Sequence, residues 1–265
     1  MKSSIVALIT AVTLGLASNA ALAARCKHKA DREATFPAAD VQTVEIFALA
    51  GELRVRGDVD ATEIVAKGDA CVSREGMLEG TGITMRELPD RLQVLVELPD
   101  TREESDSEWE GELAIMDLSI ALPDSVAVIV HDSSGGIQLD NLASLELSDS
   151  SGDIEIEQVA GPVLIPRDSS GDIDMRGVGA VTIQVDSSGE IFIDGADSVT
   201  IANDTSGDIM LRRISGNVLI GNDSSGTISV RDVGGSFIVE NDTSGGINYR
   251  EVAGNVSLPE NRQGG

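Results

Sequence analysis

The fold is decided by the stretch NDSSGTISVRDVGGSFIV, residues 222–239. Apolar side chains stand at every second position in two short runs, first at Ile228 and Val230 and then at Phe237 and Val239. Such alternation is typical of a β-strand that buries one face. Segments rich in Gly, Ser and Asp, which favour turns, separate the two runs. The stretch therefore predicts the order turn, strand, turn, strand.

The same pattern repeats along the second half of the chain. The motif Asp-Ser-Ser-Gly, or Asp-Thr-Ser-Gly, occurs seven times, at spacings of 17, 19, 18, 18, 19 and 19 residues. Five residues after each Asp stands an isoleucine, and these are Ile137, Ile154, Ile173, Ile191, Ile209, Ile228 and Ile247. Strands this short bury a core only if successive repeats stack in register, about 4.8 Å apart, with like side chains on like. The repeat thus predicts an all-β fold, a single-stranded parallel β-helix (solenoid) of seven coils over residues 126–260.

The rest of the chain lacks the motif. Residues 41–125 alternate like strands, so we expect degenerate β-coils or a β-cap that covers the first regular coil. Residues 24–40 are expected to form an N-terminal arm. In the tail, residues 261–265, residues 261–264 look like a degenerate eighth turn. We expect this polar tail to blunt the open edge of the last coil, with pairing of that edge to another copy of the chain as the alternative. The acidic loop 101–112 contains Trp109, which either packs on the sheet or is an exposed contact residue.

Residues 1–23 have the pattern of a secretory signal peptide. Lys2 supplies the positive start, residues 5–16 are a short apolar region, and Ala21-Leu22-Ala23 is a small-x-small cleavage site. The apolar run is too short for a membrane anchor, so we expect no integral membrane segment after cleavage. The protein is therefore predicted to be exported, to the periplasm, the cell surface or the extracellular space.

The chain has two cysteines, Cys26 and Cys71. In an oxidising compartment they are expected to form a disulfide, which would stabilise the fold by roughly 3–4 kcal/mol in the chain-entropy model. A reactive or metal-binding thiol pair is the alternative, but the sequence has neither a CxxC motif nor a nearby histidine cluster. A lipid-attachment signal at Cys26 is disfavoured by Arg25, which stands where such signals require a small residue.

Composition restricts the kinds of partner. The formal net charge is −26, and aromatic residues make up 2% of the chain. Such a field repels nucleic acid and anionic membrane surfaces, and few rings are available to stack on bases or sugars. It favours cations, cationic peptides or solubility alone. The expected partner is thus a protein or glycan surface whose identity the sequence does not specify.

The motif aspartates form the strongest candidate site. Stacking in register would bring them about 4.8 Å apart in one row; the row consists of Asp132, Asp149, Asp168, Asp186, Asp204, Asp223 and Asp242. One interpretation is structural, because an Asp side chain accepts hydrogen bonds from backbone N–H groups two or three residues on, as an Asx-turn. The other is a calcium site, because carboxylates and backbone carbonyls are calcium ligands. A second acidic column follows the motif glycine in some repeats, namely Asp153, Asp172, Glu190 and Asp208. We expect turn capping, with calcium binding as the alternative and no other cofactor.

Catalysis is not expected. The chain has only two histidines, His28 and His131, and adjacent residues such as His131, Asp132 and Ser133 point in different directions, which disfavours a relay among them. The sevenfold recurrence of the Asp-Ser-Ser-Gly motif also indicates a structural role, because catalysis needs only one site. Parallel β-helices host polysaccharide-cleaving enzymes, but coils of 17–19 residues leave little chain for the loops that build a cleft.

The repeat unit in residues 222–239 resembles the "putative adhesin", or β-strand-repeat, family of bacterial envelope proteins. The resemblance covers residues 41–258 and is strongest from residue 132 onward. It implies a right-handed solenoid, and it carries over no catalytic residues. Our leading hypothesis is a non-enzymatic exported envelope protein that serves as an adhesin-like binding or structural module. The alternatives are a calcium-binding solenoid and a polysaccharide-active enzyme.

Overall fold

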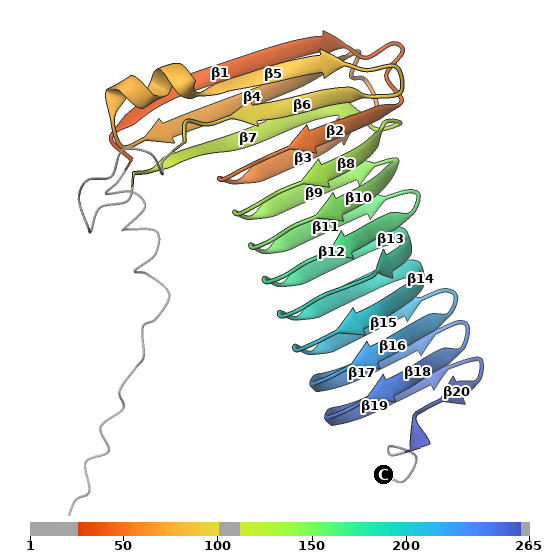
Figure 1. The fold of residues 1–265 in the computed structure, drawn as a ribbon. Coiled ribbons are helices and arrows are strands. Elements are labelled where there is room, and N and C mark those ends of the chain that lie inside the picture. The colour runs from red at the N-terminus through yellow and green to blue at the C-terminus, as the bar shows by residue number, and fades with distance from the viewer. Residues whose placement is uncertain (1–25, 101–111, 261–265) are drawn as a thin grey trace, which may run out of the picture.

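The structure is a computed structural model that describes residues 26–100 and 112–260 (Figure 1). The expected signal peptide (1–23), Arg25, Trp109 and the tail (261–265) lie outside the described residues. Two parallel β-sheets face each other and are connected, coil after coil, into one stacked rod. The predicted all-β solenoid is confirmed.

The strand before each motif turn lies in one sheet, here called the first sheet, and the strand after the turn lies in the second sheet. Two strands, β13 (Ile173–Ile183) and β14 (Ile191–Asp204), run through a corner and contribute to both. The other strands of the first sheet are β2 (Thr43–Phe47), β8 (Ala127–His131), β10 (Ser144–Ser148), β12 (Val163–Arg167), β16 (Val218–Asp223), β18 (Phe237–Asp242) and β20 (Val256–Ser257). Those of the second sheet are β3 (Leu53–Asp58), β9 (Ile137–Leu142), β11 (Ile154–Val159), β15 (Ile209–Ile214), β17 (Gly226–Val233) and β19 (Gly245–Val252).

Like side chains stack on like, as the repeat predicts. Ile191 pairs with Ile173 in the coil before and with Ile209 in the coil after. The three isoleucines are fully buried, and a parallel column containing Ile193 lines the same core. Each coil therefore contributes one layer to a continuous apolar interior between the two sheets.

Glycine is required at the motif corner because successive coils approach each other closely there. Gly226 has φ of +136°, a conformation that L side chains rarely adopt. A Cβ at this position would collide with the carbonyl oxygen of Gly207 in the preceding coil. Gly245 has the same relation to Gly226, so the corner glycines stack directly on one another.

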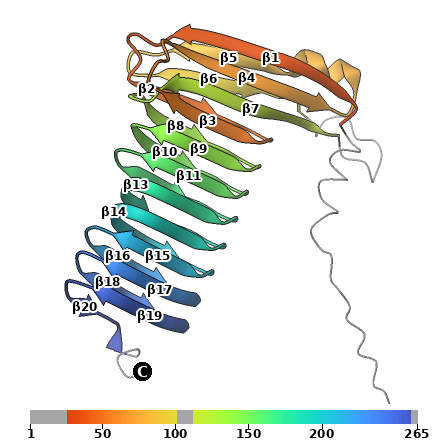
Figure 2. The same ribbon diagram turned by 180° about the vertical axis from the view of Figure 1, so that it is seen from behind.

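An extra coil without the motif precedes the seven repeats. Strand β2 pairs in parallel with β8, and β3 pairs in parallel with β9, so residues 43–58 stack on the first regular coil. Beyond them each sheet continues with further strands (Figure 2), and those of the second sheet have ten residues each. In the first sheet, β6 (Leu92–Glu97) lies on β2, and β5 (Gly82–Glu87) pairs antiparallel with β6. In the second sheet, β7 (Ala114–Pro123) lies on β3, followed by β4 (Glu63–Val72) and β1 (His28–Pro37), both antiparallel.

The segment expected as an N-terminal arm contains the edge strand β1. All ten of its residues are in register with β4. Backbone pairing holds this polar stretch, and Lys29, Asp31 and Glu33 are exposed and keep the sheet edge hydrophilic. A short 3₁₀ helix, η1 (Glu75–Gly80), follows β4 and buries Met77. In residues 26–100 and 112–260 no helix has the length and apolar character needed to cross a membrane.

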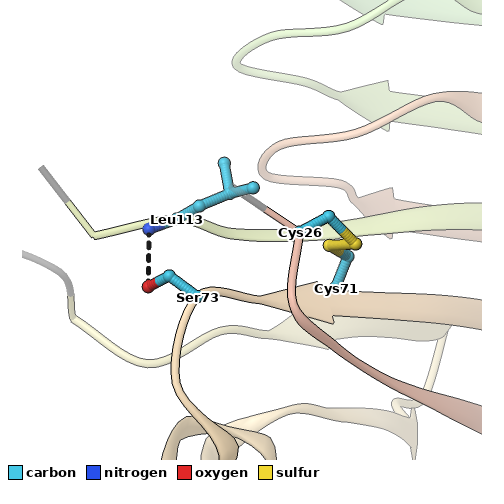
Figure 3. Close-up of a disulfide and its surroundings, with 4 residues drawn as sticks. All are labelled: Cys26, Cys71, Ser73 and Leu113. Atoms are coloured by element: carbon cyan, nitrogen blue, oxygen red, sulfur yellow. Dashed lines mark hydrogen bonds between the residues drawn. A yellow bond between two sulfur atoms is a disulfide. The ribbon is translucent and has the colours of Figure 1, made fainter. Parts of the chain in front are cut away.

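The predicted disulfide between Cys26 and Cys71 is confirmed, with 5.5 Å between the two Cα atoms (Figure 3). It joins the residues before β1 to the end of β4, at the edge of the second sheet. Beside it the backbone N–H of Leu113 donates to the Ser73 hydroxyl at 3.2 Å, which attaches the start of β7 to the same corner. The outermost strands of the cap are thus fixed covalently and by side-chain bonding.

The last coil is the most exposed part of the stack. Tyr249 occupies a column that is apolar and buried in the earlier coils, and it is 47% exposed. Its ring lies 6.0 Å from the ring of Phe237, which it partly covers. Within the described residues this end of the rod has no equivalent of the N-terminal cap.

We predict that Ile191→Asp unfolds several coils, because it places a charge inside a continuous apolar column. The expected loss is roughly 4 kcal/mol or more. Ser187→Ala, four residues earlier in a partly exposed turn, should cost less than about 1 kcal/mol. Thermal unfolding of both variants followed by circular dichroism measures the difference. Equally mild effects would contradict the in-register core.

Candidate functional site

The seven motif aspartates lie inside the corner of the solenoid. Their exposed fractions range from 0% to 7%. Asp168 pairs in register with Asp186, Asp186 with Asp204, and the row continues in register through Asp223 to Asp242. Parallel stacking therefore brings the predicted candidate residues together, as expected, but it encloses them instead of presenting them on a surface.

Backbone N–H groups of the motif turns lie near the aspartate side chains, as an Asx-turn requires; those of Ser150 and Ser151, for example, are near Asp149. Neither carboxylate oxygen has a partner within normal hydrogen-bond geometry in Asp132, Asp149, Asp168, Asp186 and Asp204. N–H groups of the turns also bond to the neighbouring coils. The N–H of Thr205 donates to the carbonyl of Asp186 at 3.1 Å, and that of Gly189 donates to the carbonyl of Ser206 at 3.2 Å.

Burial makes these carboxyl groups weak acids. It raises the pKa of Asp132 and Asp168 to about 7 and that of Asp186 and Asp204 to about 6, and it also raises the pKa of Asp149. In every case except Asp149, the carboxylate of an adjacent coil raises the pKa further. Nearby backbone N–H groups of the turn lower it only in part. These five aspartates therefore retain protons at pH values where a surface aspartate has lost them.

Serine hydroxyls and the carboxylates of the second acidic column form hydrogen bonds between the turns of successive coils. The third residue of the motif donates its hydroxyl to a carbonyl of the preceding coil; one example is Ser206 to Ser187, at 3.1 Å. In the second column, Asp172 accepts from the N–H of Glu190 at 2.8 Å, and Asp208 accepts from the N–H of Thr227 at 2.7 Å. These exposed carboxylates cap backbone groups between coils, so the structure uses them as turn caps.

A calcium ion would find few ligands in the buried row. Calcium takes six to eight oxygen ligands. Each gap in the row is faced by two carboxylates, and among the described residues no three acidic, histidine or cysteine side chains converge on one point. The buried oxygens without partners nevertheless fit a small cation or a proton, and the proton needs only the two neighbouring oxygens.

His131 does not point toward Asp132. Its Nε2 atom lies 3.3 Å from Oε1 of Glu45, and its ring stacks on Phe47 with the ring centroids 4.7 Å apart. Gln93 donates to Glu45 at 2.8 Å, and Arg91 lies 3.4 Å away. Burial raises the pKa of Glu45, but these hydrogen bonds and charges outweigh burial and lower it overall. The cluster stabilises an ionised carboxylate between coils, and Asp132 lies apart from it inside the corner.

Sequence reasoning missed a row of arginines on the outer face of the second sheet. Arg212 is in register with Arg231, and Arg231 with Arg250. All three side chains are exposed. The signal was present in the repeat, because each arginine stands one residue after a member of the same apolar column, at Leu211, Val230 and Tyr249.

We predict that acid stabilises the buried row. The pKa of Asp186 in the folded protein, about 6, is above its ordinary value of 3.8, so the folded state binds its proton more tightly. This contribution is complete below the ordinary pKa and is lost as the pH rises through the folded pKa. Asp186→Asn, neutral at every pH, should raise stability near pH 8 by roughly 1–3 kcal/mol and reduce its dependence on pH.

Urea unfolding of the wild type and Asp186→Asn at several pH values makes the comparison. Asp208→Asn is the matched control, because Asp208 is an exposed acid of the next turn and its replacement should leave the slope unchanged. If Asp186→Asn destabilised the protein at about pH 8, the interpretation of the row as a chain of protonated acids would be wrong.

We also predict that calcium and magnesium at equal concentration give the same melting temperature, because two carboxylates per gap cannot complete a calcium shell. Circular dichroism melts in chelator, millimolar calcium and millimolar magnesium test this. A calcium-specific rise of many degrees would make the row a metal site linked to stability.

No family model matches the sequence, and no curated protein matches it. Among solved structures, a putative adhesin from Bacteroides fragilis is similar at 12% identity and a TM-score of 0.46, over 88% of this chain and 98% of that one. A putative adhesin from Parabacteroides distasonis is similar at 12% identity and a TM-score of 0.34, over 86% and 97%. A putative lipid binding protein from the same species is similar at 14% identity and a TM-score of 0.38, over 86% and 96%.

Proposed function

We propose that the protein is a non-enzymatic exported envelope protein that acts as an adhesin-like binding module through the outer faces of its solenoid. One observation carries the proposal. The in-register stack turns the outward positions of each strand into straight rows of side chains that run across all the coils. Seven coils extend these rows over about 35 Å. Such flat, regular faces suit contact with another extended surface.

The placement of the titratable groups supports binding in preference to catalysis. The aspartates with strongly raised pKa values are sealed inside the corner, where a substrate has no access. His131 is engaged by Glu45. The strands are joined by short turns from β8 to β20, so no long loop rises above the sheets to form the walls of a cleft. These features also favour a binding module over a polysaccharide-cleaving enzyme.

The disulfide supports export. Cys26 and Cys71 are joined, and bonds of this kind persist in oxidising compartments such as the periplasm and the cell exterior. The bridge lies near the start of the described chain, immediately after the segment that has the pattern of a signal peptide. A periplasmic and a cell-surface location both agree with it.

We predict that deleting residues 1–23 keeps the protein in the cytoplasm with free thiols, because the deleted segment directs export and the bridge forms after it. The full chain should instead reach the envelope fraction, cleaved after Ala23 and without free thiols. Cell fractionation, mass spectrometry and maleimide labelling distinguish the two. Full-length protein with reduced cysteines in the cytoplasm would contradict the export proposal.

A bead assay tests binding. Beads are coated with the purified protein and are then incubated with envelope preparations of the producing bacterium. Beads coated with an unrelated protein of similar net charge are the control. Retention above that control supports a binding module. Equal retention would leave a purely structural role and would sink the binding proposal.

A further inference from the structure

The arginine row defined by Arg212, Arg231 and Arg250 occupies consecutive coils. Parallel pairing places the three residues in register, so their backbones are about 4.8 Å apart and the row extends roughly 10 Å. Alternation along each strand directs the arginines outward, since the preceding residues Leu211 and Val230 are buried. The three arginines therefore project from the solvent face of the second sheet.

Charges in the same column are balanced in the earlier coils. Arg56 lies 3.7 Å from Asp140, and Arg176 contacts Asp174 and, at 3.4 Å, Glu157. Each of these arginines therefore has a carboxylate from its own or an adjacent strand beside it. Elsewhere along this face, then, positive charge is neutralised by the protein itself.

The arginine row lacks this balance. In the part of the chain that the structure describes, Arg212 and Arg250 form no ion pair with a carboxylate. Arg231 has a single one, at 3.4 Å to Glu251, whose side chain is 63% exposed. Adjacent like charges at this spacing repel each other by about 0.9 kcal/mol even in bulk water. Three neighbouring cations on a chain of net charge −26 are thus a local reversal of sign that an anionic ligand would stabilise.

The surroundings of the row are suited to a polar chain molecule. The outward row beside it is uncharged in these three coils and consists of Met210, Ser229 and Asn248. Together with the arginines, these residues line a shallow hollow of about 490 Å³. Ser229 supplies a hydroxyl and Asn248 an amide, which exchange hydrogen bonds with hydroxyl groups. A guanidinium binds a carboxylate through two parallel hydrogen bonds.

One arginine of the row is already held in position. The guanidinium of Arg212 lies 5.2 Å from the centre of the Phe192 ring, and its Nη2 atom lies 3.0 Å from the sulfur of Met210. Arg176 lies 5.7 Å from the centre of the same ring. With two cations over it, this ring is not free to stack on a nucleic-acid base, and the net negative charge disfavours a polyphosphate.

We propose that the arginine row binds a linear polysaccharide that carries carboxylate groups, with the chain lying along the stack of coils. The carboxylates pair with the guanidinium groups, and the sugar hydroxyls bond to Ser229 and Asn248. This inference rests on the proposed binding function and names the class of ligand for one face. It explains why these three arginines have a single carboxylate partner among the described residues, Glu251, while Asp194, which is in register with Arg212, pairs with Arg213.

The test uses octagalacturonate as the probe and neutral maltooctaose as the control. Binding is measured by isothermal titration calorimetry at about 0.15 M salt, where the charges of distant acidic groups are screened. Wild-type protein should bind octagalacturonate and not maltooctaose. Replacing Arg212, Arg231 and Arg250 by Gln should weaken binding by roughly tenfold for each arginine. Arg56→Gln is the matched control, because Arg56 lies in the same column but is paired with an acid, and it should leave affinity unchanged.

Circular dichroism melts confirm that the variants are folded, and single substitutions replace the triple variant if it is not. Equal binding by wild type and arginine variants would overturn the site. Equally strong binding of single-stranded oligothymidylate, or of vesicles of phosphatidylcholine and phosphatidylglycerol, would overturn the polysaccharide assignment. If octagalacturonate does not bind but the beads still retain envelope material, the inference fails and the proposed function stands. If neither occurs, both fail.

Discussion

In-register parallel pairing between successive coils is the constraint on which the rest of the structure depends. Each residue lies beside its equivalent in the neighbouring repeat, so a property of one position becomes a property of a whole column. Isoleucines such as Ile191 are stabilised by this arrangement, because the isoleucine of each coil buries that of the next coil. The corner glycines follow from the same constraint, since only a residue without Cβ fits where Gly226 meets the carbonyl of Gly207.

Stacking also brings like charges of successive coils close together, so they repel each other. The molecule shows three arrangements of such charged columns. Burial together with the neighbouring carboxylates raises the pKa of Asp168 to about 7, so this carboxyl group keeps its proton to a higher pH than a surface aspartate does. On the outer face, Arg176 is surrounded by acids of its own and an adjacent strand. Arginines of the arginine row cannot be neutralised by gaining a proton, and only Arg231 is paired with an acid. We therefore assign the row an anionic ligand. Calcium, which needs six to eight oxygens, is a poorer match for the aspartate row than a proton.

The two ends of the rod differ in how well they are covered. At the N-terminal end both sheets continue into strands that finish with antiparallel pairs, and the disulfide between Cys26 and Cys71 fixes the outermost strand of the second sheet, β1. At the other described end, the half-exposed ring of Tyr249 lies beside the buried ring of Phe237 and covers the core only thinly. The arginine row lies in the last three coils before that end, away from the cap.

The sequence by itself determined the strands, the motif turns, the stacked solenoid and the pairing of Cys26 with Cys71. It could do so because alternation and turn chemistry are local and the repeat multiplies each local signal seven times. Tertiary structure decided what depends on neighbours about 18 residues away. Stacking of the coils buries the motif aspartates, and turn N–H groups such as that of Thr205 bond to the adjacent coil. Backbone pairing with β4 likewise makes a cap strand of the polar segment His28–Pro37, and register alone aligns the three arginines.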